Sequence, residues 1–436
     1  MKSILFINRV YPPVSGATGQ LLAELAPELA RSGWRVTVLT AAPPSSGPRS
    51  EQLDGVNVQR VSGLPFTRAN HWRRALSYLS LYPALLWRAW RLPRHDVVVT
   101  VTDPPLLAVI GWWVTLVRGG RSVHWAQDLY PELAEELGVL RRDGWIATVL
   151  RWLSTQALRR CHTVIAVGRC MRERLVRRNL DQSRIEVIGN WGHDAGSVLT
   201  GDRPSNPFRH AHQLGDRFIV MYSGNFGLAH PFEAIVDAIT LMQRTHPQML
   251  FLLVGDGPRL EWVKQQVAVR ALTNVRFLPF QPKERLAESL GAADLHLATM
   301  EENLCGLVVP SKVAGVLAAG RPCLFLGPAD SEAARLIREH EFGEVLTGPS
   351  GEKLAGALTD WMEQPARLER VRERASTVAS VVGRPAAMTA FARVFQRALE
   401  AGRPSGVSPA PGQAFGVSWK SERASEQPRP SGALTK

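Results

Sequence analysis

Short apolar segments alternate with longer amphipathic segments along this chain, and the alternation occurs in two successive blocks. In the first block we expect strands at 3–7, 34–39, 97–101, 122–125 and 163–167, with helices at 20–32, 106–117 and 145–158. In the second block we expect strands at 218–222, 249–254, 275–278, 295–298 and 322–326, with helices at 232–243, 259–267, 286–290 and 313–319. Strands that alternate with helices predict parallel, doubly wound sheets. The fold class is therefore α/β, with two domains of similar size.

The domain limits follow from the polar stretch between the two blocks. We expect an N-terminal domain over residues 1–195, a linker over 196–215 and a C-terminal domain over 216–385. A helix is expected over 386–401. The remaining residues, 402–436, are rich in Gly, Ser and Pro, a composition typical of disorder.

Composition and charge exclude several classes of protein. Four cysteines without a CxxC pair exclude zinc ribbons and thioredoxin-like redox sites, and their scarcity fits a reducing compartment. The first apolar run turns polar at Asn8 and Arg9, so it reads as a buried strand and not as a signal peptide. The longest uncharged apolar stretch, residues 104–117, is 14 residues long and too short to span a bilayer. We therefore expect a cytoplasmic protein.

The formal net charge is +13, and part of the basic excess is concentrated between Asp54 and Asp96. This basic segment has no acidic residue, and it contains Arg60, Arg68, Arg73, Arg74, Arg88, Arg91 and Arg94 interleaved with Trp72, Tyr78, Leu79, Tyr82, Leu85, Leu86, Trp87 and Trp90. Such a mixture suits the headgroup layer of an anionic membrane. The alternative is a core helix whose arginines extend to solvent. Nucleic acid is not expected as a partner, because the sequence has no recognition motif for it.

Glycines follow the predicted strands at the positions where parallel α/β sheets bind ligands. They are Gly16 and Gly19 in SGATG, Gly224 and Gly227 in SGNFG, and Gly255 and Gly257 in VGDG. Glycine lets backbone N–H groups approach a phosphate, although strand-to-helix turns need glycine in any case. SGATG does not match G-x-G-x-x-G, and no acidic residue is placed to bind a ribose, which argues against a nicotinamide dehydrogenase.

Ser311 and Lys312 open a predicted helix directly after a strand-like run, in GLVVPSKVAGVLAAGRP. A hydroxyl, an ammonium group and free N–H groups at one helix start can hold a diphosphate. The alternative is an ordinary helix start, in which Ser311 caps the helix and Lys312 is solvated.

The segment that contains Ser311 and Lys312 resembles family 4 glycosyltransferases, in particular bacterial enzymes that build exopolysaccharide and O-antigen units. Five other segments also resemble motifs of this family, and they occur in the same order along the chain. The matching segments are TDPP, WAQDLYPE, VIGNW, YSGNFGLAH, LLVGDGP and VVPSKVAGVLAAGRPCLFLG, and the resemblance covers about residues 1–400. It implies a retaining enzyme of GT-B fold, in which two Rossmann-like domains face across a cleft and the C-terminal one holds the donor.

The resemblance also implies a role for individual residues. Ser311 and Lys312 match the diphosphate contacts, Gly16 and Gly19 match the loop that approaches the donor phosphate, and Asp128 matches the position that faces the transferring sugar. Asn190 would lie at the domain junction. No metal and no cofactor are implied, since basic side chains neutralise the diphosphate, and the sequence has no DxD to hold a divalent cation.

The chain departs from the family pattern at three places. The paired glutamates spaced E-x7-E are missing. Counted from Glu302, the second position is Pro310, and when the family motif is aligned on Pro310, Ser311 and Lys312, Gly315 stands where the second glutamate would be. The usual Arg and Lys after the first C-terminal strand are replaced by Asn225 and His230. His230 could donate to a phosphate oxygen or be an exposed loop residue.

Two further residues keep a structural alternative. Glu332 could supply the ribose contact, or it could be a carboxylate at a helix start. Asp128 could be a turn residue in DLYPE and not an active-site carboxylate.

The function expected from these observations is sugar transfer from a nucleoside diphosphate sugar to a lipid-linked glycan acceptor, at the inner face of the plasma membrane. Asp128 and Lys312 are the expected catalytic residues. The expected donor-binding residues are Gly16, Gly19, Gly224, Asn225, His230, Ser311, Lys312 and Glu332. The alternatives are a sugar-nucleotide epimerase of the same shape and a non-catalytic scaffold of a polysaccharide assembly complex.

Overall fold

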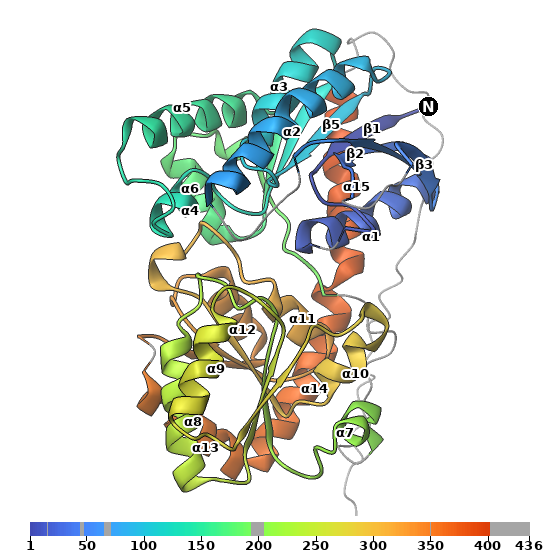
Figure 1. Cartoon of the computed structure of the whole chain (residues 1–436). Helices are drawn as coiled ribbons and strands as arrows, with labels where there is room; N and C mark the ends of the chain where they lie inside the picture. Colours follow the sequence, from blue (N-terminus) through green and yellow to red (C-terminus); the bar gives the residue numbers. More distant parts are fainter. Residues whose placement is uncertain (15, 44–47, 65–70, 193–204, 349, 402–436) are drawn as a thin grey trace, which may run out of the picture. The chain divides into compact units, whose positions relative to one another are not determined.

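The computed structural model describes residues 1–14, 16–43, 48–64, 71–192, 205–348 and 350–401, and these residues form two sheets with helices packed on their faces (Figure 1). Every strand pair is parallel except β3–β4. The doubly wound α/β class expected from the alternation of elements is confirmed.

The first sheet has eight strands in the order β3-β4-β2-β1-β5-β6-β7-β8. Its strands are β1 (Ser3–Ile7), β2 (Arg35–Ala41), β3 (Ser50–Leu53), β4 (Val56–Val61), β5 (Val97–Val101), β6 (Arg121–Ala126), β7 (Thr163–Ala166) and β8 (Ile185–Val187). The helices of this half are α1 (Ala17–Arg31), α2 (His71–Arg91), α3 (Leu107–Arg118), α4 (Glu132–Glu136), α5 (Trp145–Arg160) and α6 (Arg169–Arg177).

The second sheet has six strands in the order β11-β10-β9-β12-β13-β14. Its strands are β9 (Ile219–Ser223), β10 (Leu250–Val254), β11 (Val275–Leu278), β12 (Leu295–Thr299), β13 (Cys323–Leu326) and β14 (Gly343–Leu346). The helices are α7 (Pro207–Ala211), α8 (Phe232–Thr245), α9 (Leu260–Val269), α10 (Leu286–Gly291), α11 (Lys312–Ala318), α12 (Glu332–His340), α13 (Gly351–Glu363), α14 (Pro365–Val382) and α15 (Arg384–Ala401).

Strand β1 shows why the central strands read as continuous apolar runs. Ile4 and Phe6 point into the core on one face of the sheet, whereas Leu5 and Ile7 point into the core on the other. Since helices cover both faces, every position of the strand is buried.

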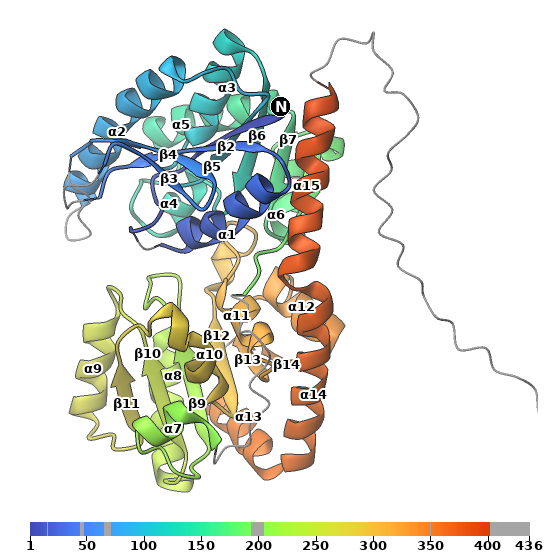
Figure 2. The same cartoon turned by 90° about the vertical axis from the view of Figure 1, so that its right-hand side faces the viewer.

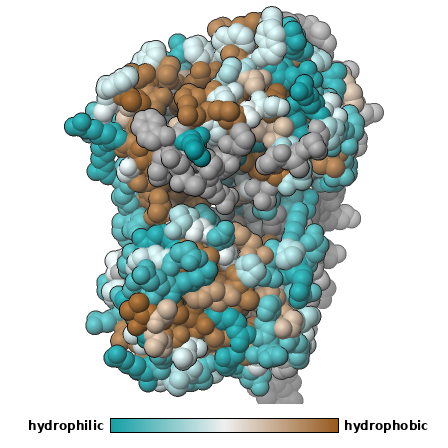
Figure 3. All heavy atoms as spheres, in the orientation of Figure 1, coloured by the Kyte–Doolittle hydropathy of each residue, from teal (hydrophilic) through white to brown (hydrophobic). Residues whose placement is uncertain are grey.

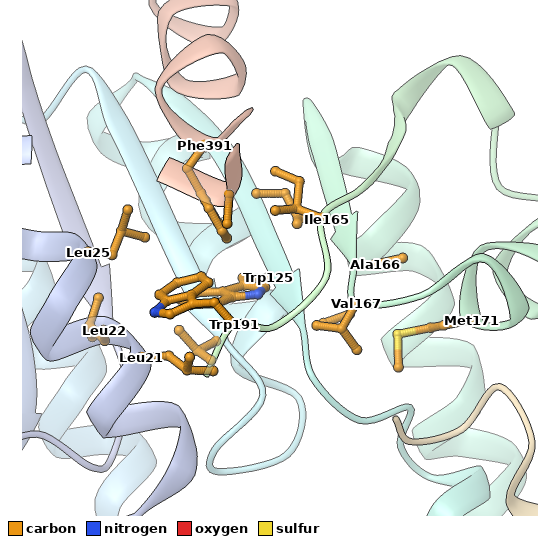
Figure 4. Close-up of a cluster of buried hydrophobic side chains, with 14 of the residues drawn as sticks. Leu21, Leu22, Leu25, Trp125, Ile165, Ala166, Val167, Met171, Trp191 and Phe391 are labelled. Carbon is orange, nitrogen blue, oxygen red and sulfur yellow. The ribbon is translucent and has the colours of Figure 1, made fainter. Parts of the chain in front are cut away.

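The last described helix, α15, packs against the first sheet although it follows the second one in sequence (Figure 2). Its Phe391 lies over Trp125 of β6 at 4.7 Å between ring centroids, and Trp191 stacks on Trp125 at 6.0 Å (Figure 4). Aromatic pairs of this geometry add to the free energy of apolar burial. The helix expected over 386–401 is therefore an integral part of the N-terminal half.

The predicted linker needs a correction. Residues 193–204 lie outside the described residues, but 207–211 form α7, which Asn206 caps by accepting from the N–H groups of Phe208 and Arg209. Phe208 is fully buried against the second sheet, and Arg209 forms a buried ion pair with Asp294 at 2.8 Å. The segment from Asn206 onward thus belongs to the C-terminal half. The polar composition predicted a linker because Asn206, which caps a helix, and Arg209, which forms a buried ion pair, are both polar residues.

Part of the basic segment forms α2, and one face of this helix is core. Leu81 and Leu85 of this helix are buried in the core, and the Arg88 guanidinium donates to Gln59. Arg60, in β4, is buried and paired with Glu51, so it cannot face a membrane as expected. Arg68 and the side chains of Trp72 and Arg74 lie outside the described residues.

The outer surfaces of α2, α3 and α5 carry large exposed apolar side chains, which together we call the apolar face (Figure 3). Its members are Leu76, Leu79, Trp87, Trp90, Trp113, Leu116, Val117, Trp145, Ile146, Val149 and Trp152. Trp145 is 77% exposed and Leu116 is 69% exposed. Among the described residues, none of the helices is both long enough and apolar enough to span a bilayer.

Candidate functional site

Both sheets have a switch point beside their first strand, where neighbouring chain connections run in opposite directions. In the first sheet β1 lies between β2 and β5, and in the second sheet β9 lies between β10 and β12. Ligands of open α/β sheets bind outside the carboxyl ends of the strands at such points. We therefore expect the ligand-binding residues in the loops after β1, β5, β9 and β12.

The loops after β9 and β10 are tied together by their backbones. The Gly224 N–H donates to the Val254 carbonyl at 2.9 Å, and the Phe226 N–H donates to Asp256 at 2.9 Å. At Gly257, whose φ is +152°, a Cβ would lie 2.6 Å from the Phe226 oxygen, so the loops can approach only with glycine there. This glycine serves loop packing, whatever else the loops bind.

Lys312, the first residue of α11, reaches into the loop after β9. Its Nζ lies 3.0 Å from His230 Nε2 and 5.0 Å from the centre of the Tyr222 ring. Gly224 makes room for it, since a Cβ there would lie 2.5 Å from Lys312 Cε. The structure thus brings Gly224, His230 and Lys312 together, which sequence reasoning had only placed on separate loops.

The hydrogen bonds of His230 define its tautomer. Its Nδ1 lies 2.7 Å from the Thr299 carbonyl oxygen, which can only accept, so Nδ1 carries the proton and Nε2 accepts from Lys312. Burial, with the nearby Lys312 charge as a second cause, lowers the pKa of His230 to about 3. His230 is therefore a neutral acceptor for Lys312 in the free protein and does not itself present a proton to a phosphate.

Lys312 is half-buried, and burial lowers its pKa to about 7. No carboxylate among the described residues forms an ion pair with it. A desolvated ammonium group without a counter-ion favours binding of an anion. Ser311 beside it is exposed and its hydroxyl makes no capping hydrogen bond, so the simple cap expected as an alternative does not form.

In the N-terminal half, Asp128 lies in the loop after β6. Burial, with Asp103 as a second cause, raises the pKa of its carboxyl to about 7. Asp103, after β5, is itself held by Arg9 through two hydrogen bonds of 2.8 and 2.7 Å. The Asp128 backbone pairs with Val308, three residues before Ser311. Asp128 is thus near the segment that leads to Lys312.

The other predicted residues have different surroundings. Gly19 lets α1 approach the preceding loop, because a Cβ would lie 2.8 Å from the Val10 oxygen, and a Cβ at Gly16 would lie 2.9 Å from the Val10 side chain. Asn190 exchanges two hydrogen bonds with Gln127, of 3.0 and 2.7 Å. Asn225 is exposed beside the Lys312 cluster. Phosphate contact by these residues stays a prediction.

Glu332 is engaged elsewhere. Its carboxylate accepts from the Arg169 backbone N–H at 2.6 Å and from the Arg169 Nε at 3.1 Å, and only 8% of its side chain is exposed. The ribose contact suggested for Glu332 would have to compete with this ion pair. The local sequence around Glu332 does not predict a partner that lies 163 positions away.

Two polar residues near the cluster were missed by sequence reasoning. The Glu301 N–H donates to Ala229 at 3.0 Å, next to His230, and burial, with Glu233 as a second cause, raises the pKa of its carboxyl. Arg259 donates from its backbone to Phe226 and pairs with Glu233. Glu301 directly precedes Glu302, the residue tested for E-x7-E spacing, and Arg259 directly follows GDGP, so both lay one position from recognised motifs.

Within the part of the chain that the structure describes, no three His, Cys, Asp or Glu side chains gather in a way that could hold a metal ion. The candidate site is therefore built from one lysine, a neutral histidine, a free serine hydroxyl and glycine loops. Independence of metal stays a prediction.

Comparison with protein families gives two matches that follow one another along the chain. The model of the glycosyl transferase 4-like domain matches residues 16–191, and the model of glycosyl transferases group 1 matches residues 202–378.

Two curated bacterial proteins are similar in sequence. The chain is 28% identical to the probable glycosyltransferase WbjE of Pseudomonas aeruginosa over 58% of its own length, and spans 62% of that relative. It is 26% identical to the putative colanic acid biosynthesis glycosyl transferase WcaI of Escherichia coli over 85% of its own length and 95% of that relative.

Solved structures share the fold. The Anabaena protein Alr3699/HepE in complex with UDP and glucose matches with a TM-score of 0.70 at 17% identity, over 91% of this chain and all of that chain. WaaG, a glycosyltransferase involved in lipopolysaccharide biosynthesis, matches with a TM-score of 0.63 at 18% identity, over 90% of this chain and 99% of that chain. The two-domain GT-B architecture expected from the sequence motifs is confirmed.

Proposed function

We propose that this chain, which belongs to the glycosyl transferase 4-like and group 1 families of GT-B glycosyltransferases, transfers a sugar from a nucleoside diphosphate sugar to a lipid-linked glycan acceptor. The observation that carries the proposal is the half-buried ammonium group of Lys312, which has His230 and not a carboxylate as its partner. WcaI, named for colanic acid biosynthesis, supports a role in cell-surface polysaccharide synthesis.

In this proposal Lys312 and the Ser311 hydroxyl bind the diphosphate of the donor. When the bond between the anomeric carbon and the diphosphate breaks, the leaving oxygen takes the electron pair, and the Lys312 charge stabilises it. The same charge binds the ground-state diphosphate, so both affinity and rate depend on it. A UDP-sugar is the first donor to test, because a structural relative was crystallised with UDP-glucose.

The sugar would acquire oxocarbenium character, and Asp128 lies on its side of the site in this proposal. A carboxyl with a pKa near 7 is part protonated at neutral pH, so it can donate to a sugar hydroxyl or, as the carboxylate, flank the positive charge. With no protein nucleophile assigned, the acceptor hydroxyl attacks from the face that the diphosphate leaves, and its proton passes to the departing phosphate oxygen. The anomeric configuration is then retained.

The reaction is proposed to need no divalent metal. A fixed ammonium group and hydroxyl neutralise the leaving diphosphate in the role that a cation has in other enzymes. Transfer in excess EDTA should therefore proceed at nearly the full rate. A tenfold loss of rate that magnesium or manganese restores would contradict this part of the proposal.

We further propose that the enzyme works at the inner face of the plasma membrane, where the apolar face contacts lipid. The tryptophans and leucines of α2, α3 and α5 suit the boundary between headgroups and acyl chains, and exposed Arg73 and Arg91 suit anionic headgroups. Arg91 lies 4.2 Å over the Trp87 ring, so charge and aromatic surface are presented together.

A transfer assay tests the proposed function. The protein is incubated with a panel of radiolabelled nucleoside diphosphate sugars and a membrane lipid extract, and label in the organic phase is counted. Transfer by the wild type and its loss in Asp128→Asn would support the assignment. Every donor left unchanged would contradict it and favour the non-catalytic scaffold, whereas interconversion of the free nucleotide sugars would contradict it and favour the epimerase.

A further inference from the structure

A second concave site lies at the other end of the first sheet from the candidate active site. It is formed where β6, β7 and β8 begin, whereas the loops of the active site follow the ends of strands. Its volume is about 690 Å³. Residues from the last turns of α3 and α5 and from α15 complete the wall. None of the motifs that match the glycosyltransferases contributes to it.

Four arginines from different parts of the chain line this pocket: Arg121 of β6, Arg160 of α5, Arg184 before β8 and Arg397 of α15. Glu186 is the acidic residue among the lining residues, and it pairs with Arg397 at 2.6 Å. The lining therefore carries three positive charges in excess. Positive charges that line one pocket repel one another, and an anion bound between them relieves that repulsion.

His162 also lines the pocket, and the charges of the arginines act on its imidazole. Burial lowers its pKa, and the charges of Arg121, Arg184 and Arg397 lower it further. Thr163 and Ser183 are also lining residues, and the Ser183 hydroxyl donates to Asp181 at 2.7 Å. Guanidinium groups with hydroxyl donors are the usual surroundings of bound phosphate.

Part of this charge also stabilises the fold. Arg121 donates to the Ala401 carbonyl at the end of α15, and Arg160 donates to Gln156 at 2.8 Å and lies 4.6 Å over the Trp112 ring. The carboxyl-terminal ends of α3 and α5 add partial negative charge nearby. Arg184 lies 3.7 Å from Asp181 and donates to the Arg159 carbonyl. Arg160 and Arg184 nevertheless remain exposed, and the four arginines outnumber the two carboxylates, Glu186 and Asp181.

We infer that this pocket binds a phosphate-bearing anion. Two sources share that chemistry: a soluble phosphorylated compound and the headgroup of an anionic lipid. Leu116 belongs both to the pocket wall and to the apolar face, so a headgroup could reach the arginines from a membrane. The inference does not rest on the proposed function.

Calorimetry with inorganic pyrophosphate tests the site in the full chain. We expect Arg160→Gln/Arg184→Gln to weaken one binding event at least tenfold, since each charge-assisted contact to phosphate is lost. The matched control is Arg177→Gln/Arg393→Gln, which removes two exposed arginines outside the pocket, one of them a turn from Arg397. Melting temperatures of both double variants verify that they fold. A Lys312→Ala variant identifies any pyrophosphate bound at the donor site.

Sedimentation with vesicles separates the two sources. If binding to vesicles of phosphatidic acid in phosphatidylcholine falls tenfold in the pocket variant alone, and pyrophosphate does not bind there, the source is a lipid headgroup. If pyrophosphate binds and vesicle binding is unchanged, the source is soluble. Equal binding of both probes by wild type, pocket variant and control would overturn the inference. Loss of pyrophosphate binding in Lys312→Ala alone would also overturn it, because pyrophosphate would then bind only at the proposed donor site.

Discussion

At the scale of single residues, the candidate site depends on the charge of Lys312. We expect Lys312→Ala to weaken binding of UDP-glucose ten- to a hundredfold, because a charge-assisted hydrogen bond to phosphate contributes roughly 1.5–3 kcal/mol. Calorimetry measures the affinity. Lys264→Ala, which removes an exposed lysine from α9, is the matched control. Unchanged affinity in Lys312→Ala would exclude the lysine from the donor site.

The pKa of Lys312 makes a second prediction. Burial lowers it to about 7, so in the free protein the ammonium group is largely deprotonated at pH 8.5. A bound diphosphate favours the charged form and raises this pKa again, so binding at pH 8.5 should take up close to one proton and affinity should fall as pH rises above 7. UDP-glucose is a suitable ligand, because its phosphates do not titrate in this range.

The measurement is calorimetry in two buffers of different ionisation enthalpy. The observed enthalpy should differ between the buffers for the wild type and agree between them for Lys312→Ala. Equal enthalpies for the wild type at pH 8.5 would contradict the uptake of a proton by Lys312 on binding.

The single residues also show what a sequence can and cannot predict. Gly224, His230 and Lys312 were identified individually, since each is in a recognisable strand-to-helix loop or helix start. That Nε2 of His230 accepts from Lys312, 82 positions away, depends on which strands are neighbours in the sheet. The ion pair between Arg169 of α6 and Glu332 of α12 joins helices that follow strands of different sheets, so strand order alone does not predict it. Contacts between distant loops need the strand order, which local patterns do not contain.

At the scale of elements, the loop after β9 controls where Lys312 lies. Gly224 has a φ of +142°, and an added Cβ would lie 2.5 Å from Lys312 Cε. We expect Gly224→Ala to displace the lysine side chain and to weaken UDP-glucose binding about as much as Lys312→Ala. Gly356→Ala, at a glycine with open space around it, is the control. Equal affinity of wild type and Gly224→Ala would contradict this role for the glycine.

Helix α15 is the element whose position was least expected. We expect Phe391→Ala to destabilise the N-terminal half by roughly 3–5 kcal/mol, because it removes a fully buried ring that packs against both Trp125 and Trp191. Thermal unfolding measures the loss, with exposed Arg393→Ala on the same helix as the control. The same melting temperature in all three proteins would contradict the packing. The sequence predicted this helix but gave no sign of which sheet it covers.

The apolar face is an element-scale feature that the sequence showed only in part. Composition indicated α2, yet the most exposed tryptophan among the described residues, Trp145, lies on α5. We expect Trp145→Ser/Trp152→Ser to reduce sedimentation with anionic vesicles at least tenfold, since two large apolar side chains leave the lipid boundary. Phe280→Ser, an exposed aromatic residue of the C-terminal half, is the control. Equal sedimentation of all variants would contradict the lipid contact.

At the scale of the whole molecule, the alternation of strands and helices was sufficient to predict two parallel α/β sheets. The boundary between the halves was less predictable. Polar composition marked 196–215 as a linker, but Asn206, Phe208 and Arg209 join the second half through a cap, a buried ring and an ion pair. The central claim concerns both halves, because the proposed donor site and the proposed lipid contact lie on different ones.

Transfer of label from a nucleoside diphosphate sugar into membrane lipid, measured in excess EDTA, tests this claim most directly. We predict that the wild type transfers label at nearly the rate seen without EDTA. Lys312→Ala should lose most of the transfer, and Trp145→Ser/Trp152→Ser should lose transfer to membrane lipid while keeping it to a short soluble acceptor. Label that stays in water with every donor of the panel, or label transferred equally well by Lys312→Ala, would contradict the account.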